Sequence, residues 1–270
     1  MTRNGQEKFW KRGISLDIIT SSSNQRVKDW KKLSQKKARI KQGKYMLDGW
    51  HLVKEAIIFD QPISEILVTQ DFKHRNELEV PDNAEVIEIS DNVAKHLSET
   101  PSPQGIFAVV NLPENAEEKP KKATGAWLFL DGVQDPGNIG TMVRTADACG
   151  FSGVVFGEGC ADMFQPKVVR AMQGSQFHLK LCSGNLIEWA KEFKQRKLPV
   201  FGSELNDQAR SYDQVGRHSD FALVMGNEGN GMSEKLLKET SLNLYIPIKG
   251  HAESLNVAVA AGILMFGLME

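Results

Sequence analysis

Apolar residues recur with two different periods over the first 110 positions, which indicates short strands alternating with amphipathic helices. Val27, Trp30, Leu33 and Ile40 fall on one side at helical spacing after the polar run at residues 21–24, whose side chains suit a helix N-cap. The same periods predict further helices at residues 51–59, 72–78 and 92–97 and strands at residues 45–47, 64–69, 85–89 and 105–110. This alternation is typical of a compact α/β domain.

A second α/β pattern follows residues 112–124, a segment with two prolines and mixed charges that is typical of a linker. It opens with an apolar run at residues 127–130, as expected of a strand buried on both faces of a parallel sheet. The pattern predicts later strands at residues 153–156, 179–182 and 199–202, a loop and helix at residues 131–149, and helices at residues 166–172 and 186–196. We therefore expect a flexible extension at 1–17, a smaller domain at 18–111 and a larger one at 125–270.

The last fifty residues contain two more apolar runs of strand length, 221–225 and 244–248, each followed by a glycine-rich or polar turn. We expect two strands and two helices here, the second helix being apolar on every side. Sheets of this class bind ligands at such strand ends. The loop at 226–231 lacks the Lys-Ser/Thr pair of a Walker loop and the GxGxxG spacing, and Glu228 would repel a phosphate. It favours a neutral or positive ligand with hydrogen-bond donors.

Two other segments have side chains suited to chemistry. A turn rich in Asp, Pro and Gly follows the strand at 127–130, a helix begins near Asn138, and Arg144 lies about a turn and a half into that helix. Ser254 and Asn256 open the last helix. Each segment taken singly also fits an ordinary capped helix.

The net charge of -1 conceals a strong asymmetry. The first 60 residues contain 14 Lys and Arg against six Asp and Glu, a net charge of +8, which leaves -9 for the remainder. Nine of these cations lie between residues 26 and 44 with only Asp29 opposing them. A solvated helix face is one interpretation, and contact with a polyanion is the one that this density favours.

Composition excludes several classes of protein. The three cysteines are too widely spaced for a metal or redox pair, and the six histidines form no HExxH or Cys/His ligand spacing, so we expect no metal. The longest apolar stretch, residues 257–269, is too short and too rich in glycine to span a bilayer. We expect a cytoplasmic protein with no membrane anchor.

Three segments together resemble the signature motifs of the SpoU (TrmH-type) RNA 2′-O-ribose methyltransferases: residues 135–140 with Arg144, residues 226–231, and residues 246–248 with 253–260. Residues 166–171 are similar to a helix in the middle of that family's domain. The N-terminal part, from residues 19–24 through the basic helix to 44–45 and 48–49, resembles the family's L30e-like substrate-binding domain. The resemblance implies a trefoil-knotted (SPOUT-type) parallel-sheet domain, in which the tail threads through a loop of its own chain, preceded by a smaller L30e-like α/β domain.

The resemblance also implies an activity: S-adenosylmethionine-dependent 2′-O-methylation of ribose in structured RNA, with 23S-type ribosomal RNA as the favoured substrate. It implies a homodimer with the site at the subunit interface. Backbone around four positions would hold the cofactor: Gly202, Gly226, Ile246 and Leu255. The catalytic set would be Asn138, Arg144, Glu228, Ser254 and Asn256. The RNA contacts would be Lys36, Lys37, Arg39, Lys44 and Arg170.

Arg144 matches the arginine that the family places beside the reacting hydroxyl. A guanidinium stays protonated at neutral pH, so we assign it to an RNA phosphate and to the alkoxide as it forms, rather than to free-base catalysis. Three alternatives remain open: a non-catalytic RNA-binding or assembly protein on the same fold, a transfer RNA methylase, and a resistance methylase acting on ribosomal RNA.

Overall fold

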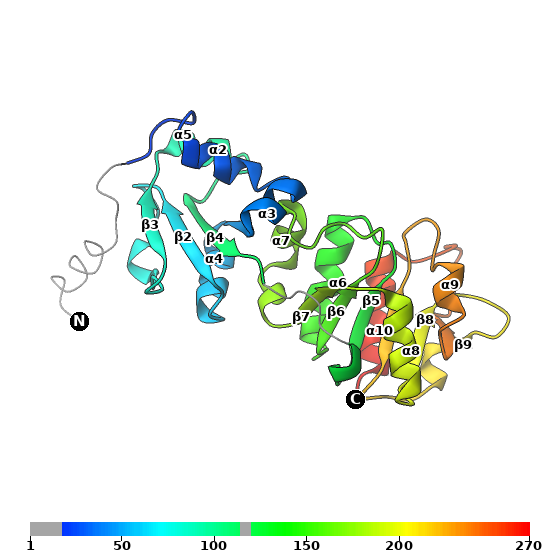
Figure 1. Cartoon of the computed structure of the whole chain (residues 1–270). Coiled ribbons are helices and arrows are strands. Elements are labelled where there is room, and N and C mark those ends of the chain that lie inside the picture. Colours follow the sequence, from blue (N-terminus) through cyan, green and yellow to red (C-terminus); the bar gives the residue numbers. More distant parts are fainter. Residues whose placement is uncertain (1–17, 114–119) are drawn as a thin grey trace. The chain divides into compact units, whose positions relative to one another are not determined.

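The computed structural model describes residues 18–113 and 120–270 (Figure 1). The chain divides into two compact units, the first running to Pro113 and including Phe164–Arg170, and the second holding the remainder. The predicted extension at 1–17 and part of the predicted linker, residues 114–119, lie outside the described residues. The domain limits 18–111 and 125–270 therefore stay predictions.

A four-stranded mixed sheet forms the N-terminal unit, in the order β1-β4-β2-β3. Its strands are β1 (Lys44–Asp48), β2 (Ile63–Val68), β3 (Glu85–Glu88) and β4 (Ile106–Asn111). Its helices are α2 (Gln25–Lys32), α3 (Lys36–Gln42), α4 (Trp50–Ile58) and α5 (Asp91–Leu97), with a 3-10 turn, η1 (Arg75–Glu77). Strand β4 runs antiparallel to both β1 and β2, whereas β3 runs parallel to β2. Val27, Trp30 and Leu33 pack with Leu67 and Phe107 in its core.

The basic segment forms two helices rather than the single helix that its apolar spacing predicted. The chain turns between α2 and α3, so residues beyond the turn present a different face. Ile40 is consequently 67% exposed and does not share the buried side of Val27, Trp30 and Leu33, although its spacing had predicted that it would. Arg39, only 2% exposed, takes an inward position, where its Nη1 donates to the carbonyl oxygens of Leu33 (2.8 Å) and Ser34 (2.9 Å). This arginine holds the turn between the two helices.

The second unit contains a seven-stranded sheet in the order β7-β6-β5-β10-β8-β11-β9, and all its pairs are parallel. Its strands are β5 (Trp127–Leu130), β6 (Gly153–Phe156), β7 (Lys180–Ser183), β8 (Val200–Ser203), β9 (Arg210–Ser211), β10 (Ala222–Met225) and β11 (Leu242–Tyr245). Its helices are α6 (Pro136–Ala148), α8 (Leu186–Gln195), α9 (Glu234–Leu237) and α10 (Val257–Leu268), with 3-10 turns η2 (Pro120–Lys122), η3 (Ser175–Phe177) and η4 (Tyr212–Gln214). Helix α7 (Pro166–Met172) lies between β6 and β7 in the sequence, and its residues up to Arg170 belong to the first unit. The predicted α/β class with a parallel sheet is thus confirmed.

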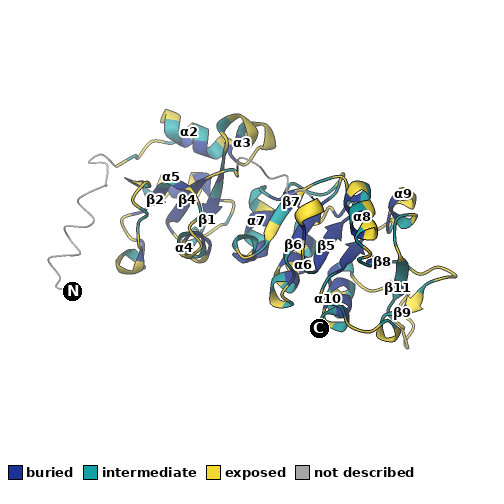
Figure 2. Cartoon of the chain, turned by 60° about the horizontal axis from the view of Figure 1, so that its bottom comes forward, coloured by how far each residue is buried: buried dark blue, intermediate teal, exposed yellow. Residues whose placement is uncertain are grey.

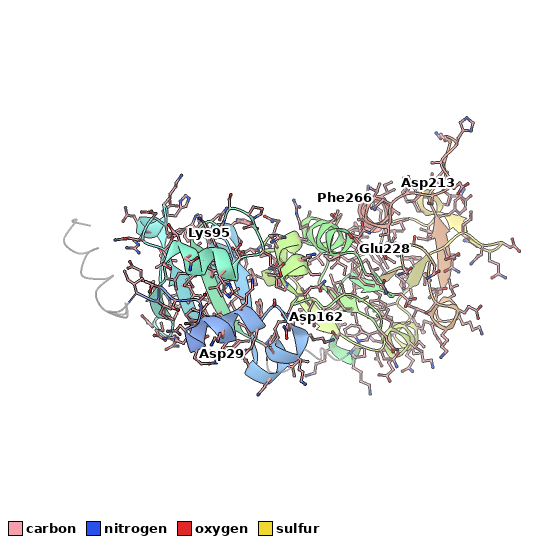
Figure 3. All side chains as sticks on the ribbon, turned by 90° about the horizontal axis from the view of Figure 1, so that it is seen from above. Asp29, Lys95, Asp162, Asp213, Glu228 and Phe266 are labelled. Carbon is pink, nitrogen blue, oxygen red and sulfur yellow. The ribbon has the colours of Figure 1, made fainter. Side chains whose placement is uncertain are left out.

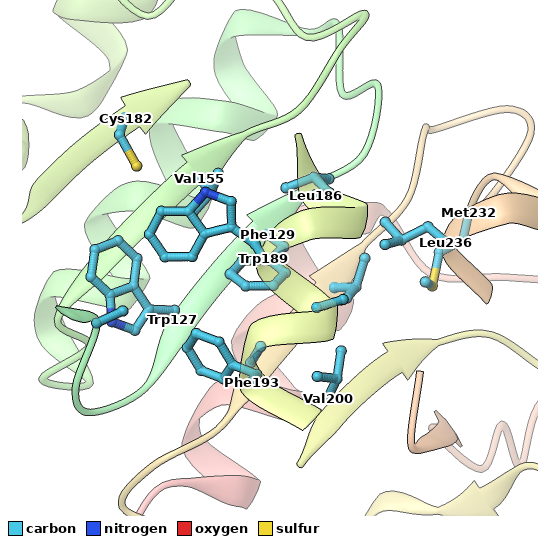
Figure 4. Close-up of a cluster of buried hydrophobic side chains, with 14 residues drawn as sticks. Trp127, Phe129, Val155, Cys182, Leu186, Trp189, Phe193, Val200, Met232 and Leu236 are labelled. Carbon is cyan, nitrogen blue, oxygen red and sulfur yellow. The ribbon is translucent and has the colours of Figure 1, made fainter. Parts of the chain in front are cut away.

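Helix α8 buries one face of this sheet through an aromatic cluster (Figure 4). The Trp127 and Trp189 rings lie 4.9 Å apart between centroids, and Phe129 meets Phe193 edge-on at 5.6 Å. Side chains alternate along a strand, so the other residues of β5 face the opposite side, where α6 and α10 pack against each other. Central strands β5, β6 and β10 are buried along their whole length (Figure 2).

Three elements differ from expectation. The helix predicted at 72–78 is reduced to η1, the first helix of the tail is the four-residue α9, and the two-residue edge strand β9 was not predicted. No helix in residues 18–113 and 120–270 is long and apolar enough to cross a membrane. Over the same ranges, no group of His, Cys, Asp and Glu side chains could hold a metal ion.

Candidate active site

Strands β5 and β10 lie side by side at the centre of the sheet, and the site begins where both end. Asp131 follows β5 and Gly226 follows β10. The backbone N–H of Asp131 donates to the Met225 carbonyl (2.9 Å), and the Ser233 N–H donates to Asp131 Oδ2 (2.7 Å). The tail loop is therefore folded back onto the strand ends by a carboxylate that the sequence pattern did not single out.

Asn227 shapes the glycine-rich loop from within. Its N–H and carbonyl pair with the carbonyl and N–H of Gly231 at 2.9 and 3.0 Å. Its Oδ1 accepts from the N–H groups of Gly229 and Asn230, and its Nδ2 donates to the Gly132 carbonyl (2.8 Å). One side chain thus closes the loop and ties it to the turn after β5, a role that the glycine pattern alone did not reveal.

Glu228 lies at the tip of this loop and contacts the start of α6. Its carboxylate accepts from the backbone N–H of Asp135 (3.0 Å) and Gln134 (3.3 Å) and from Asn138 Nδ2 (3.1 Å). Burial favours the neutral acid, but a hydrogen bond from its own backbone N–H, together with those from Asn138, Asp135 and Gln134, outweighs it and lowers the pKa of Glu228. The sequence predicted only that Glu228 would repel a phosphate, and the structure shows in addition that it binds the amides at a helix start.

Asn138 and Asn256 extend this network to the last helix. Asn256 Nδ2 donates to Asn138 Oδ1 (3.0 Å), and Asn256 Oδ1 accepts from the N–H groups of Ala258 (2.9 Å) and Val259 (3.2 Å), which caps α10. A hydrogen-bonded chain from Glu228 through Asn138 to Asn256 therefore joins the three segments that the resemblance selected. We name these hydrogen-bonded side chains, Glu228, Asn138 and Asn256, the carboxamide network.

Arg144 and Ser254 lie outside the carboxamide network. Arg144 is an exposed residue of α6, six positions after Asn138 and so about 9 Å further along the helix axis. Neither its side chain nor that of Ser254 forms a hydrogen bond or ion pair with any residue in the described part of the chain. Both side chains are open to a bound substrate.

The four positions expected to hold a cofactor cluster around neighbouring strand ends. Gly202 lies on β8, Gly226 follows β10 and Ile246 follows β11, and these strands are adjacent in the sheet. Leu255, 37% exposed, precedes the cap of α10. A side chain at Gly202 would overlap Asn243 Oδ1, a buried acceptor for which the described residues provide no donor. No sequence pattern pointed to Asn243.

Comparison with known proteins identifies the family of the chain. Residues 125–266, more than half of the chain, match the SpoU rRNA Methylase family. The chain belongs to the SpoU family. Residues 24–108 match the MRM3-like substrate binding domain, so the N-terminal unit contains a substrate-binding domain in addition to the SpoU methylase domain.

Curated and solved SpoU relatives cover nearly the full chain. The 23S rRNA (guanosine(2553)-2′-O)-methyltransferase RlmP of Bacillus subtilis is 43% identical over 250 residues, which cover 93% of this chain and 98% of that protein. An AdoMet-bound rRNA methyltransferase from Sinorhizobium meliloti superposes with a TM-score of 0.82 at 28% identity, covering 94% and 97% of the two chains. A second crystal structure of an rRNA methyltransferase from S. meliloti superposes with a TM-score of 0.83 at 27% identity, and it covers the same shares of the two chains.

The predicted RNA-binding residues of this SpoU protein differ in accessibility. Lys36 and Lys37 are exposed on α3. Lys44 is half-buried and pairs with Glu65 (3.3 Å). Arg39 is buried and bonded to backbone carbonyls, so the structure gives it a structural role and we do not carry it into the proposed RNA surface.

Arg170 lies on α7 within the segment that belongs to the first unit. It lines a small pocket there together with Asp48. Burial raises the pKa of Asp48, while a hydrogen bond from Ser98 and the positive charge of Arg170 partly offset that effect. Arg170 therefore stabilises the charge of the Asp48 carboxylate, and its contact with RNA stays a prediction.

Replacing Asn256 with alanine is expected to lower the melting temperature by about 2–4 °C, because losing a helix N-cap costs about 1 kcal/mol. Asn256→Asp separates the two functions of this side chain. The carboxylate still caps α10 but cannot donate to Asn138, so the variant should melt within about 1 °C of wild type and methylate RNA more slowly. Thermal denaturation and initial rates check both, and full activity of Asn256→Asp would remove the carboxamide network from the mechanism.

Proposed function

We propose that this chain transfers a methyl group from S-adenosylmethionine to the ribose 2′-hydroxyl of a guanosine in 23S ribosomal RNA. The observation that carries the proposal is the carboxamide network, because it joins in one site three segments far apart in the sequence. The B. subtilis relative, which spans nearly the whole chain, supports the choice of RNA and nucleoside.

The residues around Gly202, Gly226, Ile246 and Leu255 fit S-adenosylmethionine. They offer backbone hydrogen-bonding groups, two apolar side chains and the unpaired Asn243 Oδ1, a combination suited to the apolar faces and amino group of an adenine. When bound, this cofactor supplies an electrophilic methyl group on sulfur. The related AdoMet-bound structure from S. meliloti supports the same assignment.

Arg144 would hold the RNA backbone beside the target ribose. Its guanidinium carries a permanent charge and five N–H donors, which suits a phosphate and the negative charge that develops on the 2′-oxygen. The carboxamide network keeps the start of α6, and so Arg144, in a constant position relative to the tail loop. We assign Asn138, Glu228 and Asn256 to this positioning and Ser254 to substrate contact. Correct placement of two bound reactants is a large part of the rate enhancement expected of such a transfer.

Radiolabelled S-adenosylmethionine tests the proposed activity. Incubation of the purified chain with 23S rRNA from cells that lack this protein should transfer label to one guanosine ribose, located by mapping ribose methylation. RNA binding without incorporation would favour the non-catalytic alternative. Label confined to transfer RNA, or to a site that confers antibiotic resistance, would favour the other two alternatives.

We infer that the protein acts as a homodimer through α10. Val259 (52% exposed) and Phe266 (58% exposed) are seven residues apart and so lie on one side of the helix, with half-buried Ile263 between them. Phe266 projects at the outer surface of its unit (Figure 3). A helix that is apolar all round and partly open to solvent is typical of a subunit interface.

Replacing Phe266 with glutamate should therefore weaken the dimer about 10- to 100-fold, because burying one large apolar side chain contributes about 1.5–3 kcal/mol. Sedimentation over a concentration series measures the dissociation constant. Leu205→Glu, at a 74% exposed loop position, introduces the same charge away from α10 and should leave the dimer intact. A wild-type chain that sediments as a monomer at all concentrations would exclude the dimer.

The N-terminal unit would bind ribosomal RNA, and the exposed Lys36 and Lys37 would contact its phosphates. We propose that the protein acts in the cytoplasm, because a protein that modifies bacterial-type ribosomal RNA works where ribosomes are made.

A further inference from the structure

An open cleft in the N-terminal unit has no part in the site described above. It has a volume of about 760 Å³, within the range of ligand clefts. It is lined by residues of α4, of the chain after β2, of α5 and of the loop before β4. Its lining includes three aromatic rings, two lysines and two aspartates: Trp50, Phe72, His74, Lys73, Lys95, Asp71 and Asp91.

Aromatic rings form one wall of the cleft. The planes of Trp50 and His74 lie within 8° of each other, with centroids 5.4 Å apart, and Phe72 meets Trp50 edge-on at 5.5 Å. His74 Nδ1 hydrogen-bonds Glu77 Oε1 (2.7 Å), which fixes the plane of the imidazole. The His74 side chain is 45% exposed, so the stacked pair continues to an accessible surface.

Backbone hydrogen bonds hold this wall in place. Gln104 Oε1 accepts from the Trp50 N–H (2.7 Å), the Gly49 N–H donates to the Ile106 carbonyl (3.0 Å), and the Thr69 N–H donates to Gly105 (2.8 Å). The start of α4, the end of β2 and the loop before β4 are thus tied together. The cleft is preformed, so a ligand would not have to order it.

The charges that line this cleft do not favour the binding of RNA phosphates. Lys73 and Lys95 are balanced by Asp71 and Asp91, which gives no formal net charge among these lining residues. Backbone phosphates gain little from such a balance, whereas ring faces and paired donors and acceptors suit a flat heterocycle with polar edges.

We propose that the cleft binds an unpaired nucleobase of the RNA substrate, stacked on the aromatic wall and hydrogen-bonded by the aspartates and lysines. Sequence-dependent recognition of RNA commonly uses unstacked bases on aromatic side chains. The inference rests on the proposed function, since it makes the cleft a second contact with the RNA that the methylase domain modifies.

Fluorescence anisotropy of the full chain with two labelled probes tests it: a short unstructured RNA containing all four bases, and a blunt duplex of the same sequence. Trp50→Ala and His74→Ala should each raise the Kd for the single strand about 5- to 100-fold and leave that for the duplex unchanged, because one base stack contributes about 1–3 kcal/mol. Trp50→Phe should restore most of the affinity. His96→Ala is the matched control, because His96 is exposed on α5 outside the cleft.

Unchanged single-strand binding by folded Trp50→Ala and His74→Ala would overturn the proposal. Equal losses for strand and duplex, or an equal loss with His96→Ala, would also overturn it, because neither result is specific to stacking. Methyl transfer to 23S rRNA is measured on the same preparations. If the wild-type chain methylates 23S rRNA and the cleft variants bind the single strand as well as wild type, only the cleft proposal is refuted. If the wild-type chain does not methylate 23S rRNA but the cleft variants bind the single strand more weakly, only the proposed methylase activity is refuted.

Discussion

Arg144→Ala is expected to reduce kcat for ribose methylation about 100- to 1,000-fold, the usual effect of removing one donor that stabilises developing negative charge. Arg144 is exposed on α6 and makes no hydrogen bond or ion pair with the described residues, so its loss should leave the fold intact. S-adenosylmethionine should bind with unchanged Kd, because the residues proposed to hold it lie at the ends of β8, β10 and β11.

Arg144→Lys refines the test. Lysine keeps the positive charge but lacks the planar, two-pronged set of N–H donors of a guanidinium. If Arg144 binds a phosphate oxygen and the 2′-oxygen at the same time, lysine should recover only a small part of the rate. Arg217→Ala removes an exposed arginine of the same unit outside the proposed site and should retain wild-type kcat. Full activity of Arg144→Ala with 23S rRNA would refute the assignment, and a rise in KM with unchanged kcat would limit Arg144 to RNA binding.

Much of the second unit could be predicted from the sequence, because a parallel sheet has a strong local signal. Strands β5 and β10 are buried on both faces and therefore appear as short continuous apolar runs. The turns after them contain Gly, Pro and Asp, which local chemistry also explains. The ends of these strands could thus be named as a candidate site from the residue pattern alone.

The contacts within the site could not be predicted in the same way. Asn227 and Asp131 organise the loop through hydrogen bonds to groups about 100 residues away, and no periodicity reports such pairs. Asn243 is one polar residue on a short edge-side strand, and only the structure shows that its Oδ1 is buried without a donor. Arg39 was misassigned because a charge pattern does not reveal which cation the chain turns inward.

Glu228 shows how a residue that the sequence singles out can act through contacts that the sequence does not reveal. The sequence showed a carboxylate in a glycine-rich loop, and electrostatics alone indicated that it would repel a phosphate there. In the structure it accepts hydrogen bonds from the N–H groups of Gln134 and Asp135, just before α6, and from the side chain of Asn138 in the first turn. The same charge therefore excludes phosphate by occupying donors at the start of this helix. The glycine-rich loop and the start of α6 are therefore held together, and a change in the loop should alter the position of Arg144.

Gly226→Ala should show this coupling, with a loss of S-adenosylmethionine affinity of about 10-fold or more. The added methyl group would overlap the backbone of Gly231 and Met232, and backbone cannot rotate aside as a side chain does. The loop must therefore move, and Glu228 moves with it. Isothermal titration measures the affinity, and the melting temperature should also fall.

Gly229→Ala provides the matched control for this change. A methyl group at Gly229 meets only Asn227 Oδ1, at 3.7 Å, which is an ordinary contact, and the backbone there does not have a positive φ. The same substitution three residues along the same loop should thus leave cofactor affinity and activity within about twofold of wild type. Equal losses at both positions would show that the loop tolerates no side chain anywhere. A Gly226→Ala variant with normal affinity would mean that the loop after β10 does not form the cofactor pocket.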